Sequence, residues 1–424
     1  MNPANVTYLY GSYRFEWPEE GISILVSRLS EERAGLNCEI TVSTSLEPMP
    51  GLLRQGRFNL SAAQTRVSWE KALDTRLPGI DWYAAIEQVC ALSIARWRQG
   101  EPAVDLLDVR ERPGLPFLLP PFVVEGAASL LFAEGGAGKS MFALACGLAV
   151  ATGNPDILGV TPSRVGPVLY LDWEWDAESH AERLRALCRG YSIDLEHGRL
   201  FYRRETTSLA EGAETIREHI AATGAIFAIV DSLGMARGGE PESADLTIKA
   251  FAAIRTLGIT VLVLDHVVKA QGVNSKYSFG SVYTTNAARL TWRMDSSGEG
   301  NGAGYRIGLS NQKSNGKYQQ PRGYAVTVQS NENDEMTAAW YAPTDVLTVP
   351  GMEKRVPLRQ NVIGILKERP LEKEELMKEL TGRGVRTTAA VLTTTLNRNK
   401  DDFVLMGGAW CLTVERRRAE AETT

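Results

Sequence analysis

A glycine-rich segment ending in Lys139 and Ser140 carries the strongest chemical signal in this sequence of 424 residues. It reads Ala133-Glu-Gly-Gly-Ala-Gly-Lys-Ser140, a P-loop pattern with alanine where the strict pattern begins with glycine. In such a loop, backbone N–H groups surround the nucleotide phosphates, the lysine reaches the β and γ phosphates, and the serine hydroxyl ligates Mg²⁺. The sequence therefore predicts a site for ATP and Mg²⁺ formed by Gly135, Gly136, Ala137, Gly138, Lys139, Ser140 and Met141.

Carboxylates follow two apolar runs further along the chain. The run 225–231 ends in Asp231, which is the Walker B arrangement, and this carboxylate is expected to hold the hydration shell of Mg²⁺. Asp172, Glu174 and Asp176 follow another run, and a general base among them would have to reach the attacking water. The pattern alone does not choose among the three. Asp176 is also a candidate N-cap of the next helix, and Asp172 a candidate hydrogen-bond partner of the P-loop.

The elements that position these residues are predicted from apolar runs that alternate with helical periods. Runs rich in Val, Ile and Leu are typical of buried parallel strands, and the segments between them have helical periodicity. We expect strands at 129–133, 167–172, 225–231 and 259–265, and helices at 139–152, 176–189, 209–222 and 242–257. Further strands at 287–294, 304–310 and 323–329 are expected to extend the sheet with hairpins and without helices. This order predicts an α/β fold with a mostly parallel sheet.

Composition divides the chain into further segments around this core, which we place at 123–343. Residues 1–100 combine alternating strands with two helices and predict a small α+β domain of unknown role. Residues 101–122 contain five prolines and indicate a linker, and 344–356 indicate a second one.

The tail, residues 357–424, shows three helical stretches followed by two short β runs around Gly407-Gly408. This is the order of a winged helix-turn-helix domain. Its third helix carries threonines and Arg398, which suits a helix that contacts DNA, although many winged helices bind proteins instead.

Charge and cysteine usage bound the class of protein. The 46 Lys and Arg against 51 Asp and Glu give a formal net charge of −5, which excludes a general nucleic-acid binder. Five scattered cysteines without CxxC spacing and four dispersed histidines argue against a disulfide framework or a zinc site. The first residues lack the pattern of a secretory signal, and no apolar run approaches the roughly 18 residues of a membrane span. We expect a cytoplasmic protein without a membrane partner.

The order of motifs resembles the RecA-like hexameric replicative helicases, above all the plasmid RepA type and more loosely DnaB and RecA. The resemblance covers about residues 125–330. It rests on the P-loop and on Tyr170-Leu-Asp-Trp-Glu174, Ala228-Ile-Val-Asp-Ser232, Val261-Leu-Val-Leu-Asp-His266 and Lys313-Ser-Asn-Gly316. It implies a RecA-like P-loop NTPase core that hydrolyses ATP and assembles into a homo-oligomeric ring, with a hexamer expected.

The resemblance also assigns roles to single residues. It selects Glu174 as the group that activates water and His266 as the group that senses the γ phosphate, whereas the residues alone leave a buried, hydrogen-bonded histidine as an equal alternative. It implies a cation from the neighbouring subunit, for which Lys313 is the first choice and Lys317 and Arg306 are alternatives. Relatives of the DnaB type carry an arginine where this chain has Asn315, so the cation's identity stays open.

Two polar loops, 234–245 and 268–285, are expected to line the channel of such a ring. In them, Arg237, Lys269, Lys276 and Tyr277 would contact phosphates or stack on bases, while exposed loops without a special role are the alternative. The neighbouring segment 281–330 carries six Lys or Arg against two Asp or Glu.

The sequence therefore predicts an ATP-hydrolysing, ring-shaped motor that translocates on single-stranded DNA or RNA. Unwinding of duplex DNA during replication is the expected output, with a primase or an initiator as a candidate partner. One alternative is a recombinase-like or KaiC-like ATPase that binds single strands without unwinding. The other is a DNA-binding regulator, in which the winged helix reads a site and ATP switches assembly.

Overall fold

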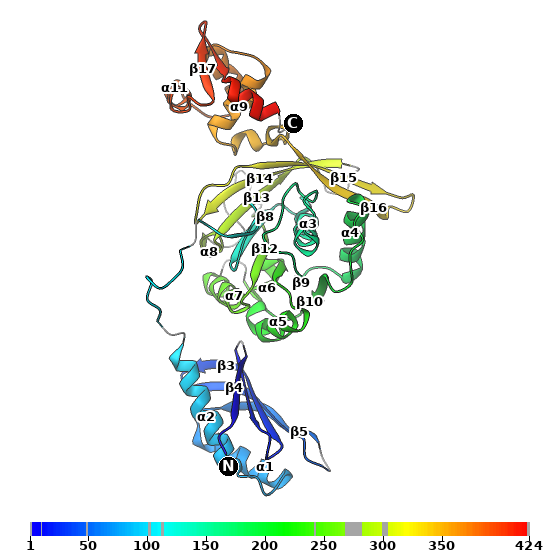
Figure 1. Cartoon of the computed structure of the whole chain (residues 1–424), viewed down its shortest axis with the longest axis vertical. Helices are drawn as coiled ribbons and strands as arrows, with labels where there is room; N and C mark the ends of the chain where they lie inside the picture. Colours follow the sequence, from blue (N-terminus) through cyan, green and yellow to red (C-terminus); the bar gives the residue numbers. More distant parts are fainter. Residues whose placement is uncertain are drawn as a thin grey trace. The chain divides into compact units, whose positions relative to one another are not determined.

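The computed structural model describes residues 2–9, 11–47, 50–100, 103–111, 114–240, 243–267, 282–298 and 304–421 (Figure 1). The chain divides into two compact units. The first comprises residues 1–111 with 211–219, and the second comprises residues 112–210 with 220–424. Among the described residues, no helix combines the length and the apolarity needed to cross a bilayer.

The first unit contains an antiparallel sheet whose five strands pair in sequence order. The strands are β1 (Asn5–Leu9), β2 (Ser12–Trp17), β3 (Ile22–Glu32), β4 (Gly35–Thr44) and β5 (Gly51–Asn59). Alternate side chains of β2 to β4 are buried, because a strand directs every second residue to the same face. Helices α1 (Ala63–Arg76) and α2 (Trp82–Gln99) share one apolar core with this sheet.

The second unit is built on a nine-stranded sheet with the order β10-β9-β11-β12-β8-β13-β14-β15-β16. The bounds are β8 (Ala128–Ala133), β9 (Val168–Asp172), β10 (Leu200–Arg204), β11 (Phe227–Asp231), β12 (Thr260–His266), β13 (Leu290–Ser296), β14 (Gly304–Ser314), β15 (Arg322–Ser330) and β16 (Met336–Thr344). Strands β10 to β13 in this order run parallel, and β14 to β16 continue the sheet antiparallel. The carboxyl ends of β8, β9, β11 and β12 therefore meet at one edge.

Helices connect the parallel strands (Figure 1). They are α3 (Lys139–Thr152), α4 (Ala177–Gly190), α5 (Leu209–Thr223), the single turn α6 (Leu233–Ala236), α7 (Ala244–Thr256) and α8 (Val282–Ala287). Helix α3 is buried along nearly its whole length, which explains its uninterrupted apolar sequence. The four strands and four helices predicted first agree with the structure to within two residues at each end.

Other parts of the core differ from the prediction. The expectation that no helix follows β12 is wrong, since α8 precedes β13, and β13 pairs in parallel with β8. A helix of six residues is too short to show a period in sequence. The sequence also did not reveal β10, an edge strand whose residues are half-buried, or β16.

Both expected linkers contain ordered structure. Strand β6 (Phe117–Leu119) pairs with β7 (Val123–Val124), and its buried residues belong to the core of the second unit. The stretch 344–356 contains two 3-10 turns, η1 (Val346–Thr348) and η2 (Met352–Lys354), whose apolar residues form a small cluster.

The tail forms helices α9 (Leu358–Glu368), α10 (Lys373–Gly382) and α11 (Ala389–Arg398), then the hairpin β17 (Phe403–Met406) and β18 (Ala409–Leu412), and finally α12 (Val414–Ala421). The order of three helices and a hairpin is the predicted one. Gly407 and Gly408 make the hairpin turn with φ of +56° and +88°, the left-handed region that such two-residue turns require. These helices and the hairpin enclose an apolar cluster of their own.

Candidate functional site

The P-loop joins the carboxyl end of β8 to the amino end of α3. Gly136 and Gly138 have φ of +77° and +90°, a region that favours glycine. A Cβ atom added at Gly135 or Gly136 would meet no atom within 4 Å, so the loop borders open space there. At Gly138 a Cβ would lie 2.7 Å from the Tyr305 hydroxyl. The loop thus borders open space at a helix N-terminus, which suits the phosphates of a nucleotide.

Lys139 begins α3 and folds back over this loop. Its side chain is buried, and its Nζ donates to the carbonyl oxygens of Ala133 at 3.3 Å and Glu134 at 3.1 Å. Nζ also lies 3.3 Å from Nδ1 of His266. Burial lowers the pKa of the ammonium group, and nearby carboxylates, first that of Asp231, oppose this shift. A phosphate bound at the loop would offer this ammonium a charged acceptor, which is stronger than a carbonyl.

Asp231, at the end of β11, lies beside the P-loop serine. Its Oδ2 accepts a hydrogen bond of 2.5 Å from the Tyr170 hydroxyl. Burial raises the pKa of this carboxyl, and hydrogen bonds from Ser140 and Tyr170 act in the opposite direction. A buried carboxylate next to a serine hydroxyl is an all-oxygen donor pair of the kind that Mg²⁺ prefers. The residues present therefore fit the predicted metal.

Glu174 lies on the turn after β9 and approaches the same cluster. Its Oε1 accepts a hydrogen bond from the Ser232 hydroxyl and lies 3.3 Å from Nε2 of His266. The hydrogen bond with His266 is the main factor that lowers the pKa of the Glu174 carboxyl, and the positive charge of Lys139 adds to it. Glu174 is therefore an ionised carboxylate at neutral pH, as a base that accepts a proton from water must be.

His266, at the end of β12, connects the P-loop lysine to this carboxylate. One ring nitrogen lies 3.3 Å from Nζ of Lys139, and the other lies 3.3 Å from Oε1 of Glu174. Its side chain is 38% exposed, so the alternative of a buried core histidine does not fit. Strand β12 lies between β8 and β11 in the sheet, so its last residue lies beside the P-loop that follows β8. Glu174 reaches it from the turn after β9, the next strand beyond β11.

Asp172 holds the turn that carries Glu174. The side chain is buried, and Oδ1 accepts from the backbone N–H of Glu174 at 2.9 Å. Oδ2 accepts from the Tyr202 hydroxyl at 3.0 Å and lies 3.1 Å from Nε2 of His180. These partners occupy the carboxylate, so Asp172 supports the turn rather than the P-loop.

Asp176 has the helix-capping role that the sequence left open. Its Oδ1 accepts from the backbone N–H of Ser179 at 2.8 Å in the first turn of α4. Of the three carboxylates after β9, Glu174 is thus the one within hydrogen-bond reach of His266 and Ser232.

The sequence did not reveal the buried partners of Asp172. Asp172, His180 and Asp231 place potential ligand atoms within 4.8 Å of one another, an arrangement that could hold a metal ion. Both carboxylates already accept hydrogen bonds from tyrosine hydroxyls, Tyr202 for Asp172 and Tyr170 for Asp231. We therefore assign the group to a buried hydrogen-bond network. No linear sequence motif predicts this network, because its members come from four separate elements.

Replacing Asp172 with asparagine is expected to lower kcat for ATP hydrolysis by about 10- to 100-fold while changing the KM for ATP far less. The amide would donate where the carboxylate accepts, so the turn carrying Glu174 would shift away from the P-loop. Steady-state kinetics measures the changes in kcat and KM separately, and thermal unfolding shows whether the variant keeps its fold. Asp176→Asn, at the half-buried helix cap, serves as the control and should leave kcat near the wild-type value. An equal loss in both variants would contradict the assigned role of Asp172.

The cation expected to act on a neighbouring subunit is held within its own chain. Lys313 Nζ donates to the carbonyl oxygens of Thr285, Asn286 and Ala288 at 3.1, 2.6 and 2.8 Å, at the carboxyl end of α8. Lys313 pairs in register with Thr291 near the start of β13, which runs parallel to β8. It therefore lies at the sheet edge opposite its own P-loop. The alternatives Lys317 and Arg306 are both exposed.

Arg237 does not fit its predicted role as a DNA contact. The residue is 3% exposed, and its Nη1 donates to the hydroxyl of Thr247 at 3.2 Å. Its Nη2 lies 3.9 Å from Oδ1 of Asp265, whose pKa is raised to about 6, mainly by burial. An enclosed guanidinium that compensates a buried carboxylate is not accessible to the phosphate of a nucleic acid. The other predicted contacts, Lys269, Lys276 and Tyr277, lie outside the described residues.

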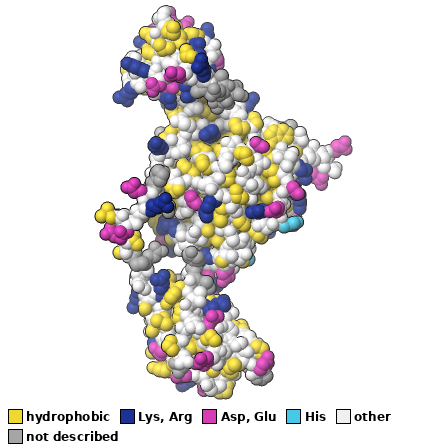
Figure 2. Space-filling view, in the orientation of Figure 1, with side chains coloured by type: hydrophobic (Ala, Val, Ile, Leu, Met, Phe, Trp, Pro, Cys, Tyr) yellow, Lys and Arg dark blue, Asp and Glu magenta, His cyan; other side chains and the backbone are white. Residues whose placement is uncertain are grey.

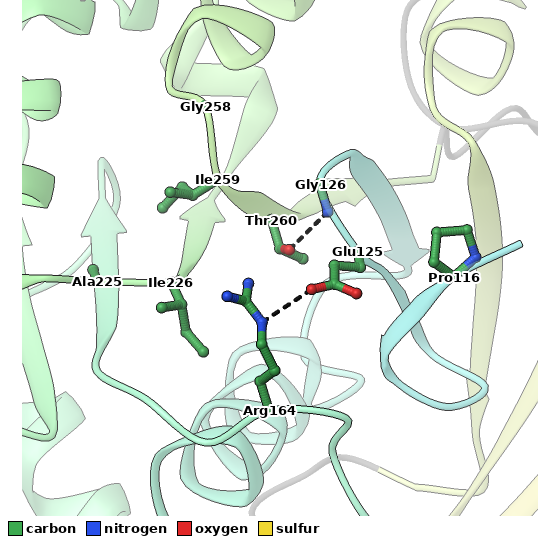
Figure 3. A pocket seen from close by; sticks show the side chains of 9 residues that line it. All are labelled: Pro116, Glu125, Gly126, Arg164, Ala225, Ile226, Gly258, Ile259 and Thr260. Carbon is green, nitrogen blue, oxygen red and sulfur yellow. Dashed lines mark hydrogen bonds and ion pairs between the residues drawn. The ribbon is translucent and has the colours of Figure 1, made fainter. Parts of the chain in front are cut away.

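A separate pocket of 470 Å³ lies at the amino ends of the parallel strands (Figure 3). Its lining includes Gly126, Ile226 and Thr260, which precede or begin β8, β11 and β12. An ion pair of 3.0 Å joins Arg164 and Glu125 across it. The P-loop lies at the carboxyl ends of the same strands, so this pocket is distinct from the phosphate site.

The fold and the arrangement of the site are consistent with a P-loop NTPase core. A family model described as an AAA domain matches residues 99–272. This stretch runs from the end of α2 past the end of β12, and it includes Lys139, Glu174, Asp231 and His266. These residues therefore carry an AAA-type ATPase domain, which implies nucleotide binding and hydrolysis. Strands β13 to β16 and the tail helices lie beyond the match.

Proposed function

We propose that the protein is an ATP-driven motor that assembles into a ring around single-stranded DNA and separates the strands of a duplex. The observation that carries the proposal is the connected cluster of Lys139, His266 and Glu174 at the carboxyl edge of the sheet. A base, a phosphate-binding lysine and a residue that contacts both are joined there by direct contacts.

In the proposed mechanism, Lys139 and the P-loop N–H groups bind the β and γ phosphates of ATP. Mg²⁺ held by Ser140 and Asp231 would neutralise charge on the phosphates. Glu174 accepts the proton of the attacking water, and Ser232 and His266 orient its carboxylate. Because His266 touches both Lys139 and Glu174, loss of the γ phosphate changes its surroundings directly. The chain continues from this histidine into the loop expected to contact DNA.

The charge distribution favours contact with nucleic acid through the inner lining of a ring over contact through the outer surface. On the face shown in Figure 2, basic and acidic side chains are interspersed, as the net charge of −5 would suggest. The segment 281–330 carries a local excess of positive charge, with six Lys or Arg against two Asp or Glu. A ring needs positive charge only where it faces the strand, because closure itself retains DNA. Such binding is expected to weaken steeply with salt.

Strand displacement on a forked duplex tests the motor proposal. The full chain with ATP and Mg²⁺ should release the displaced strand, and Glu174→Gln should not. ATP hydrolysis stimulated by single strands without displacement would favour the recombinase-like alternative. Turnover that single strands leave unchanged would favour the regulator.

A second candidate function, binding of duplex DNA by the tail, is favoured by helix α11. The helix exposes Thr394 and Arg398 beside a groove of 400 Å³ that also includes Arg359. The Thr394 hydroxyl donates to the carbonyl oxygen of Ala390 at 2.9 Å, so its oxygen remains an acceptor toward solvent. Short polar side chains with arginines on an exposed helix suit phosphate and base contacts.

Arg398→Ala in the full chain is expected to weaken duplex binding and to reduce the slope of log affinity against log salt by about 1, as for one lost phosphate contact. The rate of ATP hydrolysis should not change, because α11 packs in the tail's own apolar cluster and the P-loop residues belong to the core of the large sheet. Fluorescence anisotropy over a salt series measures both quantities. Lys378→Ala, at an exposed position on α10, is the matched control. Unchanged duplex binding in Arg398→Ala would exclude the α11 surface.

A further inference from the structure

Two tyrosine hydroxyls make the same kind of contact across the parallel strands, at the edge of the sheet that carries the P-loop. The hydroxyl of Tyr170, on β9, donates to Oδ2 of Asp231 on β11 at 2.5 Å. The hydroxyl of Tyr202, on β10, donates to Oδ2 of Asp172 on β9 at 3.0 Å. Each carboxylate belongs to the last residue of its strand. The two contacts therefore repeat one pattern on neighbouring pairs of strands.

The register of the strands explains this repetition. Tyr202 pairs with Tyr170 across β10 and β9, and Tyr170 pairs with Ile229 across β9 and β11. Asp172 pairs with Asp231 two residues further along. Because residues two apart on a strand lie on the same face of a sheet, the tyrosines and the carboxylates share one face. Each hydroxyl thus reaches the carboxylate that lies one strand over and two residues ahead.

The two carboxylates have different neighbours. Asp172 accepts from the backbone N–H of Glu174 at 2.9 Å and holds the turn that carries this proposed base. Asp231 is 4% exposed and is hydrogen-bonded with the Ser140 hydroxyl of the P-loop. The Tyr170 hydroxyl is hydrogen-bonded with Ser140 as well. One buried hydroxyl therefore contacts both of the groups that are expected to hold Mg²⁺.

Packing fixes the ring that carries this hydroxyl. Tyr170 is fully buried, and its ring centroid lies 4.4 Å from that of His180. The ring of Tyr202 lies nearly parallel to it, with an interplanar angle of 20° and centroids 6.5 Å apart. A buried ring with such neighbours has little room to change its rotamer in a close-packed core. The hydroxyl consequently holds the Asp231 carboxylate in one orientation beside Ser140.

We propose that Tyr170 is a positioning residue for the divalent cation of the nucleotide site, because its hydroxyl fixes the Asp231 carboxylate and the Ser140 hydroxyl in the arrangement that binds Mg²⁺. Hydrogen-bond partners of metal ligands contribute about 10- to 100-fold to metal affinity or activity. Tyr202 makes the same contact with Asp172 and thereby acts on the turn of the proposed base instead. The proposal rests on the nucleotide site of the proposed function and is independent of any contact with nucleic acid.

The matched pair Tyr170→Phe and Tyr202→Phe tests this assignment in the full chain. Each change removes one hydroxyl and keeps the ring. The readout is the affinity for a fluorescent, non-hydrolysable ATP analogue, measured with Mg²⁺ and again with EDTA. In Tyr170→Phe the affinity with EDTA should match that of the wild type, whereas the gain in affinity on adding Mg²⁺ should fall by about tenfold. Tyr202→Phe should keep the wild-type gain and instead lower kcat for ATP hydrolysis several-fold.

Two results would overturn the inference while leaving the nucleotide site intact. One is a Tyr170→Phe variant that keeps the wild-type gain from Mg²⁺. The other is an equal loss of that gain in Tyr202→Phe, which would indicate a general effect on packing. Failure of the wild type to bind the analogue is a different result, since it would overturn the nucleotide site itself and the inference with it.

A double-mutant cycle shows whether Tyr170 acts through Asp231. In Asp231→Asn the gain from Mg²⁺ should already be reduced, because an amide replaces the carboxylate. Adding Tyr170→Phe to this variant should change the remaining gain by less than about twofold, since residues that act through one contact are not additive. The same loss in both backgrounds would mean that Tyr170 acts independently of Asp231 and would contradict the proposal. Thermal unfolding shows that each variant is folded at the temperature of the binding measurement.

Discussion

Lys139→Ala is expected to abolish ATP hydrolysis and to weaken ATP binding by about 100-fold, or about 2.7 kcal/mol. The lysine is the one cation that the P-loop itself supplies, and its buried Nζ lies at the loop where the phosphates are expected. Without it, the phosphates would lose the one charged donor of the loop, since the other donors there are backbone N–H groups and the Ser140 hydroxyl. Titration with a fluorescent ATP analogue measures the affinity, and phosphate release measures the turnover.

The control for Lys139→Ala is Lys249→Ala, an exposed lysine on α7 that pairs with Asp245 at 2.8 Å. It removes the same charge at a distance from the loop and should leave both quantities near wild type. Thermal unfolding of each variant shows whether the fold is kept. If a folded Lys139→Ala variant bound and hydrolysed ATP normally, the P-loop could not be the phosphate site.

Glu174→Gln is expected to retain ATP binding and to lower kcat by about 10²- to 10⁴-fold, the range that a general base contributes. Glutamine keeps the shape of the side chain and can still contact Ser232 and His266, but it cannot accept a proton from water. The KM or binding constant for ATP should therefore change little. Single-turnover hydrolysis together with an equilibrium binding measurement resolves the two effects.

Glu178→Gln is the matched control, since this carboxylate lies exposed in the first turn of the following helix, α4. It should hydrolyse ATP at the wild-type rate. If Glu174→Gln turned over ATP nearly as fast as the wild type, the base would have to be another group.

The sequence predicted the phosphate site because the residues expected to form it are adjacent in sequence. The loop from Gly135 to Ser140 contains the backbone N–H groups and the lysine that are expected to bind phosphate, and the flanking strand and helix are mostly apolar. Buried parallel strands and a buried helix have strong linear signatures, so their bounds were predicted closely. Strand β10 and helix α8 lack such a signature, since one lies at the sheet edge and the other is a short turn.

The contacts that fix the turn carrying Glu174, the proposed base, could not be predicted in the same way. Alternation placed Asp172 and Glu174 on one side of a continuing strand, but β9 ends at Asp172 and a turn follows. The side chains that fix this turn, His180 and Tyr202, come from α4 and β10, far from it in sequence. Contacts of this kind depend on packing that no local pattern encodes.

Two charged residues have partners that the sequence did not predict, for a related reason. Arg237 follows the Walker B strand in a polar stretch, and a polar stretch predicts exposure. The short helix α6 turns the chain inward, where the buried carboxylate of Asp265 offsets the guanidinium charge. Lys313 similarly donates to three carbonyl oxygens at the end of α8, an element that the sequence did not reveal.

The rate of ATP hydrolysis with and without single-stranded DNA tests the central claim most directly. We expect saturating single-stranded DNA to raise kcat for ATP hydrolysis several-fold in the wild type. In Glu174→Gln, turnover should remain near background under both conditions, because hydrolysis at this cluster is what the strand stimulates. A wild-type rate that single-stranded DNA leaves unchanged, measured where binding is saturated, would contradict the claim that the protein is a motor on single strands.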